Sequence, residues 1–327
     1  MNHSISAILL LYFFVAFTGC QKEESGGNTG NSSSAGKGKK RVTLTVEGVT
    51  REYYVHVPES YTGTANVPVV FMLHGTGGNG DDMYVRSGWK EIGEEQNVLT
   101  VFPSSLRYCI NDNGETKNIT KWNTPPDADW TFCTGQVPKD DIQFLTAVIN
   151  DLGVRYKIDN KRIYLVGFSN GGQMAAKCAI SLSDRLAAVV ENASAFYMDT
   201  IYQPKRKLPV MFQVGNEDYG PGNTGPVIPL SLLDTLISTP GIPLLNGKHY
   251  RIANHHVVNF GLNPAYTISG DTNSIVWATY RPAIPATGYE FRFVFVKDLK
   301  HAYPNGENHW MEAARIHWNW LKQFNLP

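Results

Sequence analysis

The sequence predicts an α/β protein with a mostly parallel central sheet, helices on both faces and an antiparallel hairpin at the N-terminal side. Two apolar runs, 68–73 and 98–102, have the composition of strands that are buried on both faces. Residues 140–156 repeat apolar side chains every three or four positions and so predict a helix. Strands that alternate with helices build a parallel sheet, because each connection crosses back over one face.

The composition indicates one large globular domain without affinity for nucleic acid. Of the 327 residues, 42% are hydrophobic, which is enough for a sizeable core. The 29 lysines and arginines are balanced by 29 aspartates and glutamates, so the formal net charge is zero. Proteins that bind nucleic acid or an anionic membrane surface carry a basic surplus, so neither partner class is expected.

The first forty residues are predicted to lie outside the folded domain. Residues 5–17 form an apolar run that is too short to span a membrane and is typical of a signal peptide. Residues 17–20 (FTGC) resemble a bacterial lipobox, which implies a signal peptide over 1–20, lipidation of Cys20 and an outer-membrane lipoprotein, possibly reaching the cell surface. A secreted or periplasmic soluble protein is the alternative. Residues 21–40 are rich in Gly, Ser and Asn and predict a flexible linker, which leaves 41–327 as one domain.

The predicted elements of this domain begin with a hairpin. Residues 42–46 and 52–57 are rich in β-branched and aromatic side chains and flank a polar break at 47–50. Strand and helix patterns then alternate to the end of the chain. The further strands are expected at 68–73, 98–102, 162–166, 186–190, 208–214, 274–280 and 289–296, and the helices at 140–156, 171–183 and 308–324.

The pattern G-x-S-x-G occurs at 167–171, between a predicted strand and a predicted helix. This is the context of a nucleophile elbow, a tight turn that lifts a serine hydroxyl to the carboxyl edge of a sheet. Glycines at both ends of the pattern remove side chains that would collide in so sharp a turn. Ser169 is therefore the candidate nucleophile, against the alternative of an ordinary turn serine.

His301 is the candidate general base. It follows the predicted strand 289–296 and begins a loop at the carboxyl edge, where functional groups gather in such sheets. His74 lies in a glycine-rich turn and is expected to hold that loop. Six further histidines are poorer candidates, because they lie in the signal segment, in an early strand, in an adjacent pair that a strand would point to opposite faces, and in the final helix: His3, His56, His255, His256, His309 and His317.

The acid is expected directly after the strand 208–214, where Glu217 and Asp218 both stand. With Asp218 as the acid, the chain order Ser169, Asp218, His301 is the order of hydrolases that use this elbow. Two main-chain N–H groups are expected to form an oxyanion hole: that of Asn170, which opens the helix, and that of Thr76 in the glycine-rich turn.

These segments together resemble secreted esterases of the polyhydroxybutyrate depolymerase and feruloyl esterase type, which include carbohydrate esterase family one. The matching residues are 73–78 (LHGTGG), 140–141 (DD), 162–172 (RIYLVGFSNGG) and 301–304 (HAYP). The resemblance implies an α/β-hydrolase fold, a serine carboxylic-ester hydrolase (EC 3.1.1 class) and Asp218 as the acid. The acid stretch 214–218 (VGNED) and residues 299–300 (LK) before the base depart from the family pattern.

Three aromatic residues are candidates for substrate binding, with packing in the core as the alternative. Trp122 matches a Trp-Asn pair near the active site of the family, and Tyr303 stands where the family has tryptophan. Tyr219 follows the acid and is expected to line an acyl pocket. The stretch 220–263, dense in Gly and Pro, is expected to build an extra wall or lid.

The cysteines and the absence of metal motifs complete these expectations. Cys109 and Cys133 flank a polar excursion and are a candidate disulfide, while Cys178 is expected to be buried in a helix. No C-x-x-C or H-E-x-x-H pattern occurs, so neither a metal nor another cofactor is expected. The membrane is expected to be reached through the N-terminal lipid alone.

The expected substrate is an ester on plant-type polysaccharide fragments, carrying feruloyl or acetyl groups. Hydrolysis of a polyhydroxyalkanoate or another polyester is the alternative reaction. A non-catalytic glycan-binding lipoprotein on the same scaffold is the alternative of another class, because fold alone does not determine function.

Overall fold

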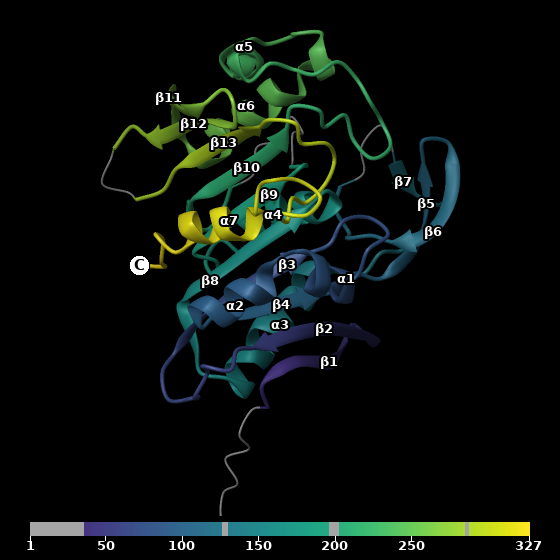
Figure 1. Ribbon diagram of the computed structural model, residues 1–327. Helices are drawn as coiled ribbons and strands as arrows, with labels where there is room; N and C mark the ends of the chain where they lie inside the picture. Colours follow the sequence, from purple (N-terminus) through teal and green to yellow (C-terminus); the bar gives the residue numbers. More distant parts are fainter. Residues whose placement is uncertain (1–35, 126–129, 196–202, 285–287) are drawn as a thin grey trace, which may run out of the picture. The chain divides into compact units, whose positions relative to one another are not determined.

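A ten-stranded sheet runs through the part of the chain that the computed structural model describes, residues 36–125, 130–195, 203–284 and 288–327 (Figure 1). Its central strands are all parallel, and antiparallel strands extend it at both edges. The strand order is β1 (Gly38–Val46), β2 (Val49–Val57), β4 (Leu99–Pro103), β3 (Val67–Leu73), β8 (Ile158–Phe168), β9 (Ala188–Asn192), β10 (Val210–Gly215), β13 (Phe291–Val296), β12 (Ile275–Pro282) and β11 (Leu262–Asp271).

Helices cover both faces of this sheet, which confirms the predicted layers. One face buries apolar side chains against α1 (Gly80–Arg86), α2 (Trp89–Gln96) and α7 (Ala313–Leu321). The opposite face does so against α3 (Asp141–Arg155), α4 (Asn170–Ser181), α5 (Leu233–Ser238) and α6 (Lys248–Phe260). Because both faces are covered, every residue of β3, β4, β9 and β10 is buried.

The N-terminal hairpin is present, with a tighter turn and an earlier start than predicted. Glu47 and Gly48 form its two-residue turn with φ of 50° and 73°, a backbone region that hairpin turns of this length require. β1 already begins at Gly38, so the predicted linker end at residue 40 is wrong by a few residues. The signal segment, Cys20 and most of the linker lie outside the described residues.

The fold differs from the prediction in several elements, and α1 and α2 are helices that the sequence does not predict. The stretch 220–263 contains the helices α5 and α6, which were not predicted, and His255 and His256 lie buried on α6 rather than on a strand. The edge strand β11 was not predicted. The final helix begins at Ala313 rather than at residue 308, and Asn305 and Glu312 pair as an isolated bridge just before it.

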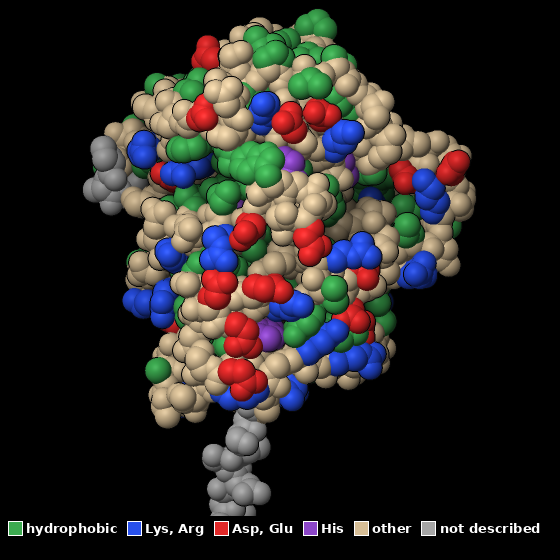
Figure 2. Space-filling view, viewed as in Figure 1, with side chains coloured by type: hydrophobic (Ala, Val, Ile, Leu, Met, Phe, Trp, Pro, Cys, Tyr) green, Lys and Arg blue, Asp and Glu red, His purple; other side chains and the backbone are tan. Residues whose placement is uncertain are grey.

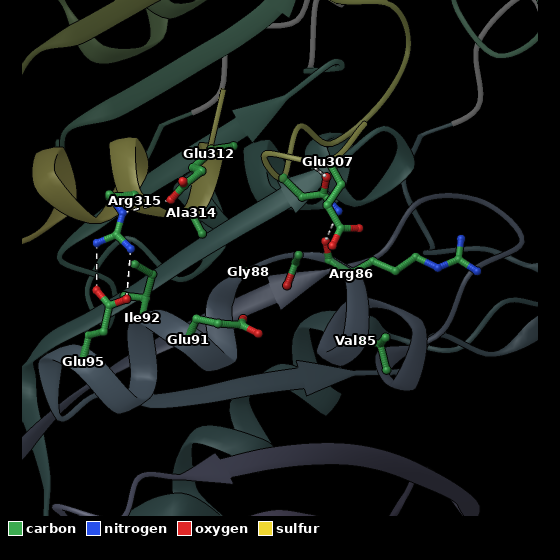
Figure 3. A pocket seen from close by; sticks show the side chains of 13 residues that line it. Val85, Arg86, Gly88, Glu91, Ile92, Glu95, Glu307, Glu312, Ala314 and Arg315 are labelled. Carbon is green, nitrogen blue, oxygen red and sulfur yellow. Dashed lines mark hydrogen bonds and ion pairs between the residues drawn. The ribbon is translucent and has the colours of Figure 1, made fainter. Parts of the chain in front are cut away.

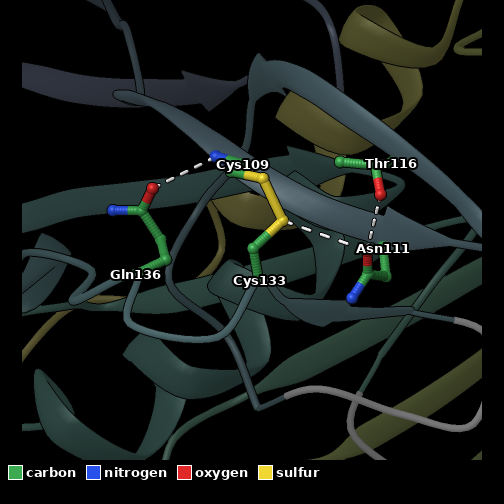
Figure 4. Close-up of a disulfide and its surroundings, with 5 residues drawn as sticks. All are labelled: Cys109, Asn111, Thr116, Cys133 and Gln136. Atoms are coloured by element: carbon green, nitrogen blue, oxygen red, sulfur yellow. Dashed lines mark hydrogen bonds between the residues drawn. A yellow bond between two sulfur atoms is a disulfide. The ribbon is translucent and has the colours of Figure 1, made fainter.

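A second, three-stranded sheet occupies the polar excursion, where the sequence predicts little regular structure. It has the order β6 (Glu115–Thr120), β5 (Arg107–Asp112) and β7 (Trp130–Phe132). The disulfide Cys109–Cys133 closes it, and Figure 4 shows the bridge beside Asn111 and Gln136. In the described part of the chain, no helix is long and apolar enough to cross a membrane.

Candidate active site

Ser169 lies in a sharp turn between β8 and α4, with φ 55° and ψ −122°. A non-glycine residue in this region is strained, and strain of this kind is typical of functional turns. A Cβ on Gly171 would lie 2.5 Å from the carbonyl oxygen of His74, so this position requires glycine. The turn holds the Ser169 hydroxyl at the carboxyl edge of the sheet, partly exposed to solvent.

His301 and Asp218 complete a hydrogen-bonded chain with this serine. His301 Nε2 lies 2.9 Å from Ser169 Oγ, and His301 Nδ1 lies 2.8 Å from Asp218 Oδ1. The Asp218 carboxylate is almost fully buried, whereas the imidazole keeps some exposure. A proton on Nδ1 faces the carboxylate, which leaves the Nε2 lone pair directed at the hydroxyl. This is the arrangement that activates a serine as a nucleophile.

Of the two candidate acids, the structure brings Asp218 to the imidazole. Asp218 Oδ1 also accepts a hydrogen bond of 2.9 Å from the Gly220 N–H, which fixes the carboxylate. The main-chain N–H of Glu217 donates to the Leu299 carbonyl oxygen at 3.1 Å and so ties the acid loop to the base loop. A Cβ on Gly215 would lie 1.8 Å from that same carbonyl oxygen, so the two loops pack directly against each other.

His74 holds the glycine-rich turn after β3, the role that the sequence predicts. Its Nδ1–H donates to the Gly75 carbonyl oxygen at 2.6 Å, and its Nε2 accepts from the Ser105 N–H at 2.9 Å. Burial lowers the pKa of His74 to about 4, so the ring is neutral at pH 7. A neutral ring matches this pattern of one donor and one acceptor.

The two predicted oxyanion donors are the main-chain N–H groups of Thr76, in the glycine-rich turn, and of Asn170, directly after the elbow serine. Within the turn, the N–H of Gly77 donates to the Thr120 carbonyl oxygen at 2.9 Å and that of Gly78 to the Gly75 carbonyl oxygen at 3.1 Å. In the described residues no protein group accepts from the Thr76 N–H, and Thr76 is exposed. Asn170 opens α4, where main-chain N–H groups lack helical partners and the helix dipole favours negative charge.

Two of the three aromatic residues predicted to bind substrate, Trp122 and Tyr303, are buried in the protein, so these two predictions are wrong. Trp122 is completely buried and donates hydrogen bonds to the elbow and to the His74 turn. Tyr303 is buried too, because its hydroxyl lies between Trp89 Nε1 at 2.9 Å and His317 Nδ1 at 3.2 Å. Tyr219 is half-buried and donates to the Pro226 carbonyl oxygen at 2.5 Å, so its ring stays beside the acid loop.

Sequence reasoning missed two side chains near the elbow. The carboxamide oxygen of Asn170 accepts a hydrogen bond of 2.7 Å from the main-chain N–H of Trp122. No sequence pattern predicts this contact. Lys121 is buried beneath the turn, with its Nζ 3.2 Å from Thr76 Oγ1 and 3.8 Å from the centroid of the Trp130 ring. Both contacts depend on the second sheet folding back onto the turn.

Besides the triad, the described residues form a cavity but no metal-holding group. No group of three or more His, Cys, Asp or Glu side chains in the described residues is arranged to hold a metal ion. A cavity of about 300 Å³ lies between α1, α2 and α7. Figure 3 shows Arg315 facing Glu95 at its wall, an ion pair of 2.7 Å. Acidic and basic side chains are interspersed over the face shown in Figure 2, as expected for a chain without net charge.

Comparisons with known proteins agree with this geometry. The sequence profile of the Phospholipase/Carboxylesterase family matches residues 61–232, more than half of the chain. Feruloyl esterase B of Piromyces equi is 23% identical over 287 residues, which are 85% of this chain and 46% of that protein. The oxidized polyvinyl alcohol hydrolase of Sphingopyxis sp. is 27% identical over 166 residues, 46% of this chain and 44% of that protein. The chain thus spans less than half the length of these two curated relatives.

The fold also matches solved structures. The acetyl xylan esterase from Aspergillus awamori superposes with a TM-score of 0.55 at 13% identity, covering 86% of this chain and 99% of that one. At this identity the likeness concerns the arrangement of strands and helices. It confirms the fold class that the sequence motifs predict.

Proposed function

The chain belongs to the Phospholipase/Carboxylesterase family, and from this premise we propose that the protein is a serine hydrolase of carboxylic esters. The observation that carries the proposal is the continuous hydrogen-bonded chain from Ser169 Oγ through His301 to Asp218. An imidazole 2.9 Å from a serine hydroxyl, itself bound to a buried carboxylate, is typical of a catalytic serine and not of a serine in an ordinary turn.

The geometry supports a two-step reaction through an acyl-enzyme. His301 Nε2 takes the Ser169 proton as Oγ bonds to the ester carbonyl carbon, and the carbonyl oxygen becomes an oxyanion facing the N–H groups of Thr76 and Asn170. The oxyanion then reforms the carbonyl, the C–O bond to the leaving alcohol breaks, and His301 returns the proton to that alcohol. Water repeats the sequence on the acyl-enzyme, which releases the acid and restores Ser169.

The substrates that we propose are feruloyl or acetyl esters of plant-type polysaccharide fragments. The similarity to a feruloyl esterase over 85% of the chain supports this class. The similarity to an oxidized polyvinyl alcohol hydrolase supports a synthetic or storage polymer as the second candidate, over a shorter segment. Release of ferulate from methyl ferulate, compared with soluble product from polyhydroxybutyrate film, separates the two. Faster turnover of the film would overturn the carbohydrate-ester proposal.

A fluorophosphonate probe tests the reaction class itself. The wild-type protein is expected to hydrolyse p-nitrophenyl acetate and to carry the probe on Ser169, as located by peptide mass spectrometry. Ser169→Ala should lose both properties while it keeps its far-UV circular dichroism. A folded wild-type protein that binds oligosaccharides, leaves the probe unreacted and hydrolyses no ester would instead be a glycan-binding protein.

We further propose that the enzyme works outside the cytoplasm as a lipoprotein. Support comes from the lipobox-like residues 17–20 and from the disulfide Cys109–Cys133, since disulfides are typical of oxidising compartments. Expression of the full chain in a bacterial host with labelled palmitate tests this proposal. The wild type should incorporate label and Cys20→Ala should not. Equal labelling of both, or of neither, would contradict it.

A further inference from the structure

Trp122 connects the two chain segments that carry the proposed oxyanion donors, so this inference rests on the function proposed above. Its main-chain N–H donates to Asn170 Oδ1 at 2.7 Å, and its indole Nε1–H donates to the His74 carbonyl oxygen at 2.8 Å. The main-chain N–H of Asn170 is one of the two proposed donors. The other is the main-chain N–H of Thr76, which stands two residues after His74 in the chain. One residue therefore bridges both halves of the hole.

Both ends of this bridge are buried. Trp122 and His74 have no exposed surface, and Asn170 is 4% exposed. The Trp122 and His74 rings also pack against each other with centroids 5.0 Å apart. Water does not compete for hydrogen bonds in such surroundings, so they hold a fixed geometry. Because Trp122 has no surface to offer a substrate, any effect on the reaction must pass through its neighbours.

The bridge is attached to rigid elements of the fold. The residue after Trp122 donates its main-chain N–H to Asp141 Oδ2 at 2.7 Å, and Asp141 Oδ1 accepts from Arg51 Nη2 at 2.6 Å. Arg51 and Asp141 form a buried ion pair between β2 and α3. The Asn123 carbonyl oxygen accepts from Lys177 Nζ of α4 at 2.8 Å. Through Asn123, the segment that carries Trp122 is thereby attached to α3 and to α4.

The Asn170 carboxamide is oriented to receive this contact. Its Nδ2 donates to Thr124 Oγ1 at 3.0 Å and to Gln173 Oε1 at 3.1 Å, so its Oδ1 faces the Trp122 N–H. These bonds identify the carbonyl and amino ends of the side chain. An aspartate or a leucine at position 170 would lose part or all of this arrangement, although its main-chain N–H would remain.

We propose that Trp122 is a positioning residue that sets the separation of the Thr76 and Asn170 N–H groups. It acts through the His74 carbonyl group and the Asn170 carboxamide. Oxyanion donors work when they lie about 2.7–3.1 Å from the developing negative charge. A displacement of about 1 Å in a reacting geometry costs on the order of 100-fold in rate. A fixed bridge between donors from distant segments is therefore of direct use to the reaction.

Trp122→Phe tests the bridge, because it removes the indole N–H and keeps the ring and the main-chain donor. The oxyanion forms after substrate binds, so kcat for p-nitrophenyl acetate should fall about 10- to 100-fold while KM changes less than about twofold. The affinity for a trifluoromethyl ketone, which forms an oxyanion adduct with Ser169, should fall by the same factor. If Trp122 had only a structural role, the loss in kcat and the loss in ketone affinity would not be equal.

Trp320→Phe is the matched control. Trp320 lies on α7 and is also buried. Its indole N–H also donates to a protein acceptor, Glu290 Oε1, at 3.0 Å. This variant should keep wild-type kcat and ketone affinity. Equal kinetic losses in both variants would show that a general loss of packing, and not the bridge, is responsible, and would overturn the inference.

Asn170→Ser provides a second variant, which also serves if Trp122→Phe does not fold. It removes the acceptor of the Trp122 N–H and keeps the main-chain donor. It should lose kcat at constant KM, and the double variant should lose little more than either single one, because both break the same bridge. Wild-type kcat and ketone affinity in a folded Trp122→Phe or Asn170→Ser protein would refute the positioning role. A wild type without any esterase activity would refute the proposed function instead.

Discussion

A Cβ atom on Gly167 would lie 1.9 Å from the carbonyl oxygen of Gly171, four residues further along the chain. No side chain fits at this distance, so the turn that presents Ser169 exists because Gly167 has none. We expect Gly167→Ala to move the elbow and to lower kcat/KM for p-nitrophenyl acetate by at least about 100-fold, since a shift of about 1 Å is enough for such a loss.

Gly153→Ala is the control for that change. Gly153 is exposed in the last turn of α3, and the nearest atom to an added Cβ would be 3.9 Å away. This variant should keep full activity and gain up to about 1 kcal/mol of stability in urea unfolding, because alanine is a better helix former than glycine. Wild-type kinetics for Gly167→Ala would show that the elbow tolerates a side chain.

Asp218→Asn should lower kcat on the order of 10⁴-fold, because an amide facing Nδ1 favours the wrong tautomer of His301. Glu217→Gln should stay within about twofold of wild type, since the structure brings Asp218 and not Glu217 to the imidazole. Steady-state kinetics with a soluble ester measure both. The reverse ranking of the two variants would assign the acid to Glu217.

Reduction of Cys109–Cys133 should lower both stability and activity. The bridge closes a segment with a sequence separation of 24 residues, and a loop of this length stabilises the folded state by about 3 kcal/mol. The same small sheet supports the oxyanion turn, because Thr120 accepts from the Gly77 N–H and donates its hydroxyl hydrogen to the Gly78 carbonyl oxygen.

Two measurements check this prediction. A Cys109→Ser/Cys133→Ser protein should have a lower urea midpoint than wild type and a lower kcat. Dithiothreitol should reproduce the loss in the wild type and leave the double variant unchanged. An unchanged kcat in a destabilised double variant would show that the disulfide of the small sheet is not needed to hold the glycine-rich turn in its active geometry.

The free energy of unfolding should fall as the pH is lowered below about 6.5. Burial lowers the pKa of His74 to about 4 and the pKa values of His249 and His317 to about 3. Between pH 6.5 and these values the unfolded chain binds protons that the folded chain does not, so each histidine removes up to about 1.4 kcal/mol of stability per pH unit. Above pH 6.5 both states are neutral at these positions and their contribution is constant.

His317→Gln checks this dependence. His317 donates its Nε2–H to Gln213 Oε1 at 3.0 Å, a bond that a glutamine amide can replace. Urea unfolding at pH 8, 6.5, 5 and 4 should give a shallower slope for the variant below pH 6.5, whatever its stability at pH 8. Identical slopes for the two proteins would show that His317 does not titrate on unfolding.

The sequence predicts the parallel core because strands such as 68–73 must be apolar on both faces to be covered twice, and that requirement is visible residue by residue. It also predicts the elbow, because three closely spaced residues and their flanking elements define the turn. By contrast, β11 is an edge strand with mostly exposed residues, and more than half of the buried residues of α6 are histidine or asparagine, so neither shows a clear apolar pattern. Their places come from packing against distant strands.

Local pattern by itself therefore determined the layers of the fold, the turn that holds Ser169 and the loop that begins at His301. The tertiary structure decided which carboxylate reaches the imidazole, that Trp122 and Tyr303 are buried rather than open to substrate, and that the Asn170 carboxamide binds the Trp122 main chain. The physical reason is range. Turn sterics and apolar periodicity act between near neighbours in the chain, whereas a hydrogen bond between residues 48 or 83 positions apart forms after the whole sheet has assembled.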